Sequence, residues 1–92
     1  MVILFFEADN NYVDIHAESG VFLSTESIGA LGGKLPDNFI RIHRGVIINK
    51  DYVKEVQKYF NSRYIITLNN KELSSLTSGR SYNAILKKWL NV

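Results

Sequence analysis

The stretch Phe39–Asn49 constrains the fold of this chain more than any other part of the sequence. Its first half alternates the apolar Ile40 and Ile42 with the polar Arg41 and His43, so an extended backbone would place the two kinds of side chain on opposite faces of a sheet. Its second half is a continuous apolar run, which indicates that the chain enters the core at once. The stretch predicts a strand that presents cationic and imidazole groups, although an ordinary edge strand with solvated charges has the same pattern.

Most of the remaining chain reads as short strands separated by turn residues. Apolar and polar residues alternate over several segments, and clusters of Asn, Asp, Ser and Gly separate them. The pattern slips near Glu55-Val56, where a β-bulge is expected. The expected strands are Val2–Ala8, Tyr12–Ala17, Val21–Ser24, Tyr52–Phe60, Arg63–Leu68 and Glu72–Thr77.

Two helices are expected beside these strands. A short one in the middle of the chain would begin at a cap formed by Ser24 or Thr25 and would bury an apolar stripe that contains Ile28, Leu31 and Leu35. The second, at the C-terminus, would begin at a cap formed by Ser78 or Ser81. Its apolar stripe has helical spacing and comprises Tyr82, Ile85, Leu86, Trp89 and Leu90.

These elements predict a mainly β fold, a small multi-stranded sheet or sandwich with a short central helix and a C-terminal amphipathic helix. A length of 92 residues corresponds to one domain, expected to span residues 1–92. The chain has no cysteine, which fits a reducing, cytoplasmic compartment. The opening apolar run is too short to cross a membrane, so no membrane association is expected.

The charges are distributed unevenly along the chain. Residues 1–33 contain five acidic residues and no Lys or Arg, a net charge of −5, whereas residues 34–92 contain all eleven basic residues and four acidic ones, a net charge of +7. Clustered cations of this kind favour a polyanionic partner, because phosphate neutralisation needs a local excess of positive charge. The same asymmetry also fits a β-rich protein-interaction module whose basic face binds an acidic partner.

No pattern of catalytic or metal-binding residues emerges. The two histidines, His16 and His43, have no second ligand at metal-binding spacing. The serines near them lack a nucleophile elbow, and no glycine-rich phosphate loop precedes a helix. We therefore expect no enzymatic activity, no metal and no cofactor.

Three polar segments stand at the ends of expected elements: residues 9–11, 43–45 and 78–81. Two of them place an Arg beside a glycine, and the first contains two Asn residues. Arg is the side chain best shaped to read guanine in the major groove, and Asn reads adenine in the same way. These segments are candidates for base recognition.

Segments 3–16, 35–49 and 79–82 together resemble the LytTR family of bacterial DNA-binding domains, in the same order and over essentially the whole chain. The most specific of them is Phe39-Ile40-Arg41-Ile42-His43-Arg44, followed by an apolar run and Asn49. The resemblance implies a fold of several strands with short helices that reads duplex DNA by loops inserted into successive major grooves. Two residues depart from the family pattern, which has Ser in place of both Gly45 and Gly79.

The resemblance also implies roles for individual residues. The implied base-contacting residues are Asn10, Asn11, Arg44 and Arg80. The residues expected to contact phosphate or to position the loops are Arg41, His43, Gly45, Lys50, Lys54, Ser81 and Lys87, and Lys58 and Lys88 are further candidates for phosphate contacts.

The implied function is that of the effector domain of a bacterial transcriptional regulator of the response-regulator type, acting in a two-component system. The implied partner is double-stranded DNA at direct-repeat promoter sites, with a homodimer forming on the DNA. Most members carry an N-terminal receiver or sensor domain, and none is present in these 92 residues. We expect either an excised effector domain or regulation from elsewhere.

Overall fold

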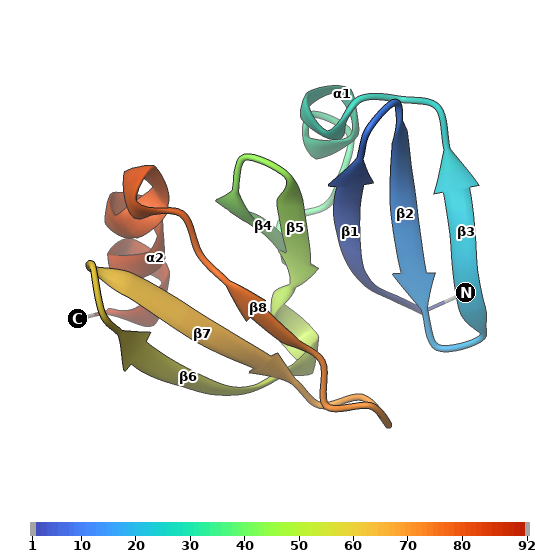
Figure 1. Ribbon diagram of the computed structural model, residues 1–92. Helices are drawn as coiled ribbons and strands as arrows, with labels where there is room; N and C mark the ends of the chain where they lie inside the picture. The colour runs from blue at the N-terminus through green and yellow to red at the C-terminus, as the bar shows by residue number, and fades with distance from the viewer. Residues whose placement is uncertain (1, 92) are drawn as a thin grey trace.

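Two antiparallel sheets form most of the molecule in the computed structural model, which describes residues 2–91 (Figure 1). The first is five-stranded, in the order β3-β2-β1-β5-β4, and the second is three-stranded, in the order β6-β7-β8. The first sheet contains β1 (Ile3–Asp9), β2 (Tyr12–Ala17), β3 (Gly20–Ser24), β4 (Phe39–His43) and β5 (Val46–Asn49), and the second contains β6 (Val53–Tyr59), β7 (Arg63–Leu68) and β8 (Ser75–Thr77). The helical elements are α1 (Ile28–Gly32), α2 (Asn83–Leu90) and the 3₁₀ turns η1 (Lys50–Tyr52) and η2 (Arg80–Tyr82). The predicted mainly β class is confirmed.

Two apolar clusters hold these layers together. One face of the five-stranded sheet packs against the three-stranded sheet and α2, while its other face packs against α1. Strand β5 contributes Val46 and Ile48 to the first cluster and Ile47 to the second. The apolar run of β5 is therefore buried on both faces, as the sequence predicted.

The hairpin turns follow the predicted chemistry. Asn10, in the β1–β2 turn, has a φ of 54°, and Asn61 and Ser62, in the β6–β7 turn, have φ values of 61° and 59°. Asn is among the few residues that adopt this left-handed region at low cost. The pairing of β6 with β7 shifts register between Val53 and Glu55, which confirms the predicted irregularity in β6.

The cap predicted for α1 is wrong. Ser27 caps the helix, since its Oγ accepts a hydrogen bond from the Ala30 amide at 3.1 Å. Ser24 instead accepts a bond from the Glu26 amide at 3.2 Å, within the turn that leads into the helix. Several hydroxyl residues precede this helix, and the chain direction decides which one faces its free amides.

The predictions for the last strand and the last helix also need correction. Strand β8 begins at Ser75, not Glu72, because Asn70 accepts a hydrogen bond from the Ser74 amide at 2.8 Å and closes a turn there. Neither Ser78 nor Ser81 caps α2, which has no side-chain cap. Ser78 is buried, and its Oγ accepts a hydrogen bond from the Tyr64 amide at 2.9 Å.

Helix α2 buries a narrower stripe than predicted. Leu86 is 0% exposed, and Trp89 and Leu90 pack against the first cluster, but Ile85 is 48% exposed. The helix therefore contacts the core through Leu86 and the two residues near its end, and the assignment of Ile85 to the core is wrong.

This difference predicts unequal costs for two neighbouring substitutions. Leu86→Ala should lower the free energy of unfolding by about 2–5 kcal/mol, because it leaves a cavity in the core. Ile85→Ala should change it by roughly 0.5 kcal/mol or less, as is usual for surface positions. Urea denaturation of the two variants measures both values, and similar losses in the two would contradict this placement of α2.

Candidate nucleic-acid interface

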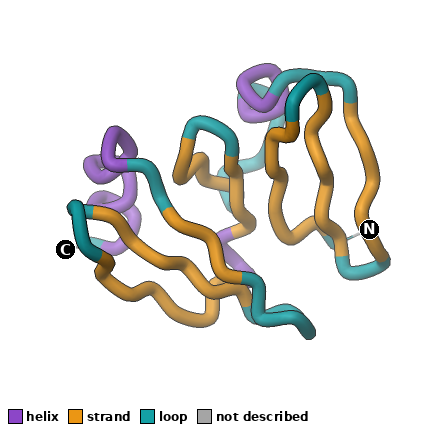
Figure 2. Tube along the Cα trace, in the orientation of Figure 1, coloured by secondary structure: helices purple, strands orange, loops and turns teal. Residues whose placement is uncertain are grey.

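Three segments far apart in the sequence meet at one end of the molecule, the upper end in Figure 1: the β1–β2 turn, the β4–β5 turn and the connection from β8 to α2. Backbone hydrogen bonds join them in a row. The Ala8 amide donates to the Gly45 carbonyl at 2.8 Å, and the Gly79 amide donates to the Ile42 carbonyl at 2.9 Å. We call residues 10–11, 44–45 and 79–81 the turn edge; Figure 2 shows its loops in teal, except where η2 begins.

The β4–β5 turn is held by two of its own side chains. The guanidinium of Arg41 donates a hydrogen bond to the Arg44 carbonyl. The Nδ1 atom of His43 accepts a hydrogen bond from the Gly45 amide at 3.1 Å. The turn therefore has a defined shape, and the Arg44 side chain extends from it into solvent.

Gly79 packs closely against this turn. A Cβ atom at this position would lie 3.3 Å from Cδ2 of His43 and 3.5 Å from Cδ1 of Tyr82. The glycine, which departs from the family pattern, thus allows the β8–α2 connection to approach the His43 ring. The approach places Arg80, the next residue, beside the β4–β5 turn.

The polar side chains of the turn edge are accessible. Asn10, Asn11, Arg44, Arg80 and Ser81 are all exposed. Arg41, His43 and Gly45 are partly buried and lie behind them. The structure therefore brings together, at one edge, all four residues for which the sequence predicted base contacts.

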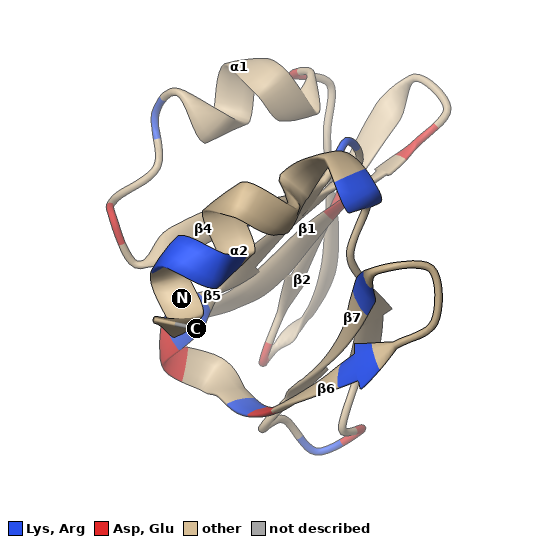
Figure 3. Ribbon diagram, turned by 90° about the vertical axis from the view of Figure 1, so that its left-hand side faces the viewer, with Lys and Arg blue, Asp and Glu red and all other residues tan. Residues whose placement is uncertain are grey.

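A basic flank continues from the turn edge along α2 and the β6–β7 hairpin, where Figure 3 shows blue ribbon on the side facing the viewer. Lys58, Arg63 and Lys87 line one shallow hollow of about 200 Å³ there, with Asn83 donating to the Ser62 carbonyl at 2.5 Å. Sequence reasoning missed Arg63. The turn signal at Asn61-Ser62 places Arg63 at a hairpin end, but its proximity to Lys87 depends on how α2 packs.

Two predicted residues do not join this surface. Lys50 lies in η1, at the end of β5 opposite to the β4–β5 turn, and is partly buried. Lys54 follows near the start of β6. The length of β5 separates both residues from the turn edge.

Within residues 2–91, no group of three or more His, Cys, Asp or Glu side chains has an arrangement that could hold a metal ion. No helix in the same range is long and apolar enough to cross a membrane.

Comparison with known proteins identifies relatives of the chain. The family model of the LytTr DNA-binding domain matches residues 1–91. The sensory transduction protein LytT of Bacillus subtilis is 31% identical over 91 residues, which cover 98% of this chain and 37% of LytT. The transcriptional regulatory protein LytR of Staphylococcus aureus strain N315 is 40% identical over 62 residues, which cover 66% of this chain and 25% of LytR.

A solved structure has the same fold. It is the LytTr DNA-binding domain of a Bacillus cereus protein described as a methyl-accepting/DNA response regulator, with a TM-score of 0.89 and 23% sequence identity. The match covers 98% of this chain and 82% of that one. The chain thus spans a quarter to about a third of the two curated relatives, and it belongs to the LytTR family of DNA-binding domains.

Proposed function

We propose that this chain binds double-stranded DNA in a sequence-specific manner by inserting the segments of the turn edge into the major groove. The observation that carries the proposal is the row of backbone hydrogen bonds that holds the segments together, Ala8 to Gly45 and Gly79 to Ile42. An array of turns projecting from a rigid scaffold can present several side chains to base edges at once.

Arg44 and Arg80 are the principal base readers in this proposal. Both are exposed, and each lies where the backbone is held, Arg44 by the bond from Arg41 to its carbonyl and Arg80 in η2 after the packed Gly79. A guanidinium held at its base can bind guanine O6 and N7 in a bidentate manner. Asn10 and Asn11 would act in the same way on adenine.

Other residues support these readers. Arg41 and His43 position the β4–β5 turn through the hydrogen bonds described above, and the Gly45 amide is engaged by His43. Phosphate contacts would come from exposed side chains on this side of the molecule: Ser81, Lys87, Lys58, Arg63 and Lys88. Lys50 and Lys54 lie away from this surface, so we assign no DNA contact to them.

The wider role proposed is that of the DNA-binding part of a bacterial transcriptional regulator of the response-regulator type. Support comes from the family and from the names of relatives such as LytR, described as a transcriptional regulatory protein. Binding to direct repeats, with two copies on one DNA, belongs to the same proposal.

Substitution of the two arginines tests the assignment of base readers. Arg44→Ala and Arg80→Ala should each weaken binding to a cognate duplex, selected from a random pool, by about 1–3 kcal/mol. Each should change binding to random duplex far less, because phosphate contacts dominate there. Fluorescence anisotropy at constant salt measures both affinities. Lys71→Ala, in the distant β7–β8 turn, is the control. If an arginine variant lost equal affinity for cognate and random DNA, the arginine replaced would contact phosphate and not a base.

The basic flank makes a separate prediction. Neutralising Lys87 to Gln should weaken binding to all duplexes about equally and reduce the slope of log K against log salt by about 1, since one fewer counterion is released. Lys54→Gln should leave the slope unchanged because Lys54 lies away from the turn edge. Titrations at several salt concentrations compare the two variants. If the slope fell for Lys54→Gln and stayed unchanged for Lys87→Gln, the DNA would lie on the side of the molecule that carries Lys54, and the proposal would be contradicted.

A further inference from the structure

Sheet edges expose unpaired backbone groups, and natural proteins usually protect them. Three of the four edge strands within residues 2–91 are protected in recognisable ways. The pairing of β4 is irregular between Arg41 and His43, and the Ile42 carbonyl accepts the Gly79 amide. Strand β6 carries two lysines and a register shift, and β8 is only three residues long.

The fourth edge strand, β3, has none of these protections. It consists of Gly20-Val21-Phe22-Leu23-Ser24, without charge or proline, and it pairs in unbroken register with β2 alone. Val21, Phe22 and Leu23 are 58%, 42% and 68% exposed. A regular, apolar and uncovered edge is suited to accept a further strand.

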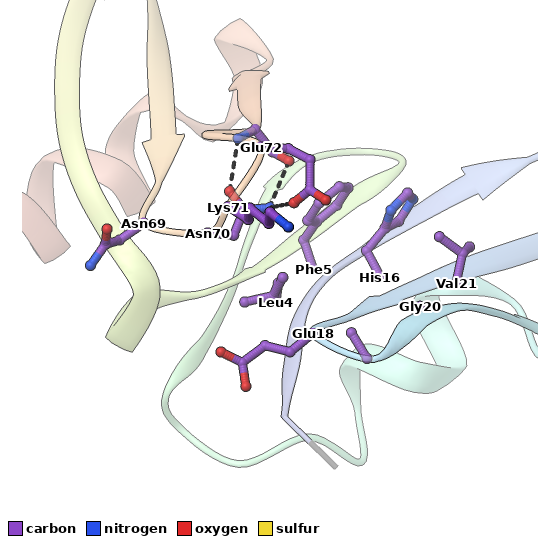
Figure 4. Close-up of a pocket in the computed structure, with 12 residues that line it drawn as sticks. Leu4, Phe5, His16, Glu18, Gly20, Val21, Asn69, Asn70, Lys71 and Glu72 are labelled. Atoms are coloured by element: carbon purple, nitrogen blue, oxygen red, sulfur yellow. Dashed lines mark hydrogen bonds between the residues drawn. The ribbon is translucent and has the colours of Figure 1, made fainter.

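The two faces of this edge differ in chemistry. Val21 lies opposite His16 and Leu23 opposite Asp14, so these side chains share one face, while Phe22 lies opposite Ile15 on the other. The face of Val21 borders a cleft of about 510 Å³ between β2–β3 and the β7–β8 turn (Figure 4). Glu18 and Glu72 contribute carboxylates to that cleft, and Lys71 contributes one ammonium group.

Two stacked rings line the cleft beneath β3. The His16 ring stacks on Phe5 with 4.0 Å between ring centroids and 10° between ring planes. The Nε2 atom of His16 is buried, lies 3.8 Å from a carboxylate oxygen of Glu7 and has no hydrogen-bond partner among residues 2–91. Such a surface suits the aliphatic stem of a long side chain whose charged head reaches the acidic rim.

The charges around β3 are negative on balance, because Lys71 is one base against the carboxylates of Asp14, Glu18 and Glu72. Glu26 pairs with Lys34 at 2.5 Å, but among the described residues no Lys or Arg lies within ion-pair distance of Asp14 or Glu18. A second copy pairing through its own β3 would bring like charges together, which is unfavourable in adjacent strands. The negative charge therefore favours a basic occupant.

We propose that β3 is a docking edge for an extended segment of a partner protein in which Lys or Arg residues alternate with apolar residues. The backbone of the segment would extend the five-stranded sheet. Its basic side chains would lie over Val21 and Leu23 towards the carboxylates, and its apolar side chains would lie beside Phe22. The β2–β3 and β7–β8 turns that border the cleft lie at the end opposite to the turn edge (Figure 1), so docking there leaves the turn edge free.

A model peptide tests the proposal directly. The probe is acetyl-Lys-Val-Lys-Val-Lys-Val-amide, titrated into ¹⁵N-labelled chain and followed by amide chemical shifts. Saturable shifts should appear at residues 20–24 and around the cleft, and the counterpart with Glu in place of Lys should produce none. The double variant Val21→Lys with Leu23→Lys should weaken peptide binding roughly tenfold or more, since lysines protect an edge. Ile85→Lys, at a position 48% exposed on α2 and away from the cleft, is the matched control.

Further measurements keep the test decisive. If this double variant melts at a lower temperature than the parent, a second double variant, Asp14→Asn with Glu18→Gln, replaces it. The second variant removes only the charge and should also weaken peptide binding. Binding of the selected duplex should be unaffected by either double variant, which separates this proposal from the DNA-binding one. The docking edge would be ruled out by equal binding of the acidic peptide, by shifts centred on β6, or by self-association through β3 in sedimentation experiments.

Discussion

The hydrogen bond from the Gly79 amide to the Ile42 carbonyl is the constraint on which the turn edge depends. The two sheets have separate ladders of backbone hydrogen bonds, and within residues 2–91 they are related by their shared core, by the connection through η1 and by this contact. On the side of the second sheet, the contact is anchored by Ser78, whose amide donates to the Tyr64 carbonyl and whose Oγ accepts from the Tyr64 amide. This contact therefore joins the turn that contains Arg44 to the segment that contains Arg80, although the two follow strands of different sheets.

The polar groups near this contact divide into two sets. Arg41 and His43 use hydrogen-bonding atoms within the β4–β5 turn, whereas the side chains of Arg44 and Arg80 extend into solvent. The first set removes conformational freedom from the backbone before any partner binds, which lowers the entropic cost of recognition. Acidic residues concentrate in the first three strands and basic ones along α2 and the β6–β7 hairpin, so a polyanion is attracted to one flank of the molecule (Figure 3).

Local sequence patterns predicted most of the fold, whereas features that depend on long-range packing could not be predicted from them. The apolar run of β5 and the Asn61-Ser62 turn each reflect neighbouring residues, and each appears as expected. Ile85 has helical spacing for the core, but the placement of α2 leaves it half exposed. Three other features arise only when both sheets pack. They are the hollow between Arg63 and Lys87, the distance of Lys50 from the turn edge and the close approach of Gly79 to His43. The four proposed base readers were implied by the family resemblance, and they lie in the three polar segments that the sequence places at the ends of expected elements.

An NMR titration of the ¹⁵N-labelled chain with its selected duplex tests most directly whether the turn edge enters the DNA groove as one unit. We expect the amides of Asn10, Asn11, Arg44, Gly45 and Arg80 to shift together at the same DNA concentration, because one rigid edge enters the groove. Shifts confined to a single segment of the turn edge, or centred on Lys50 and Lys54 at the far end of β5, would contradict this expectation.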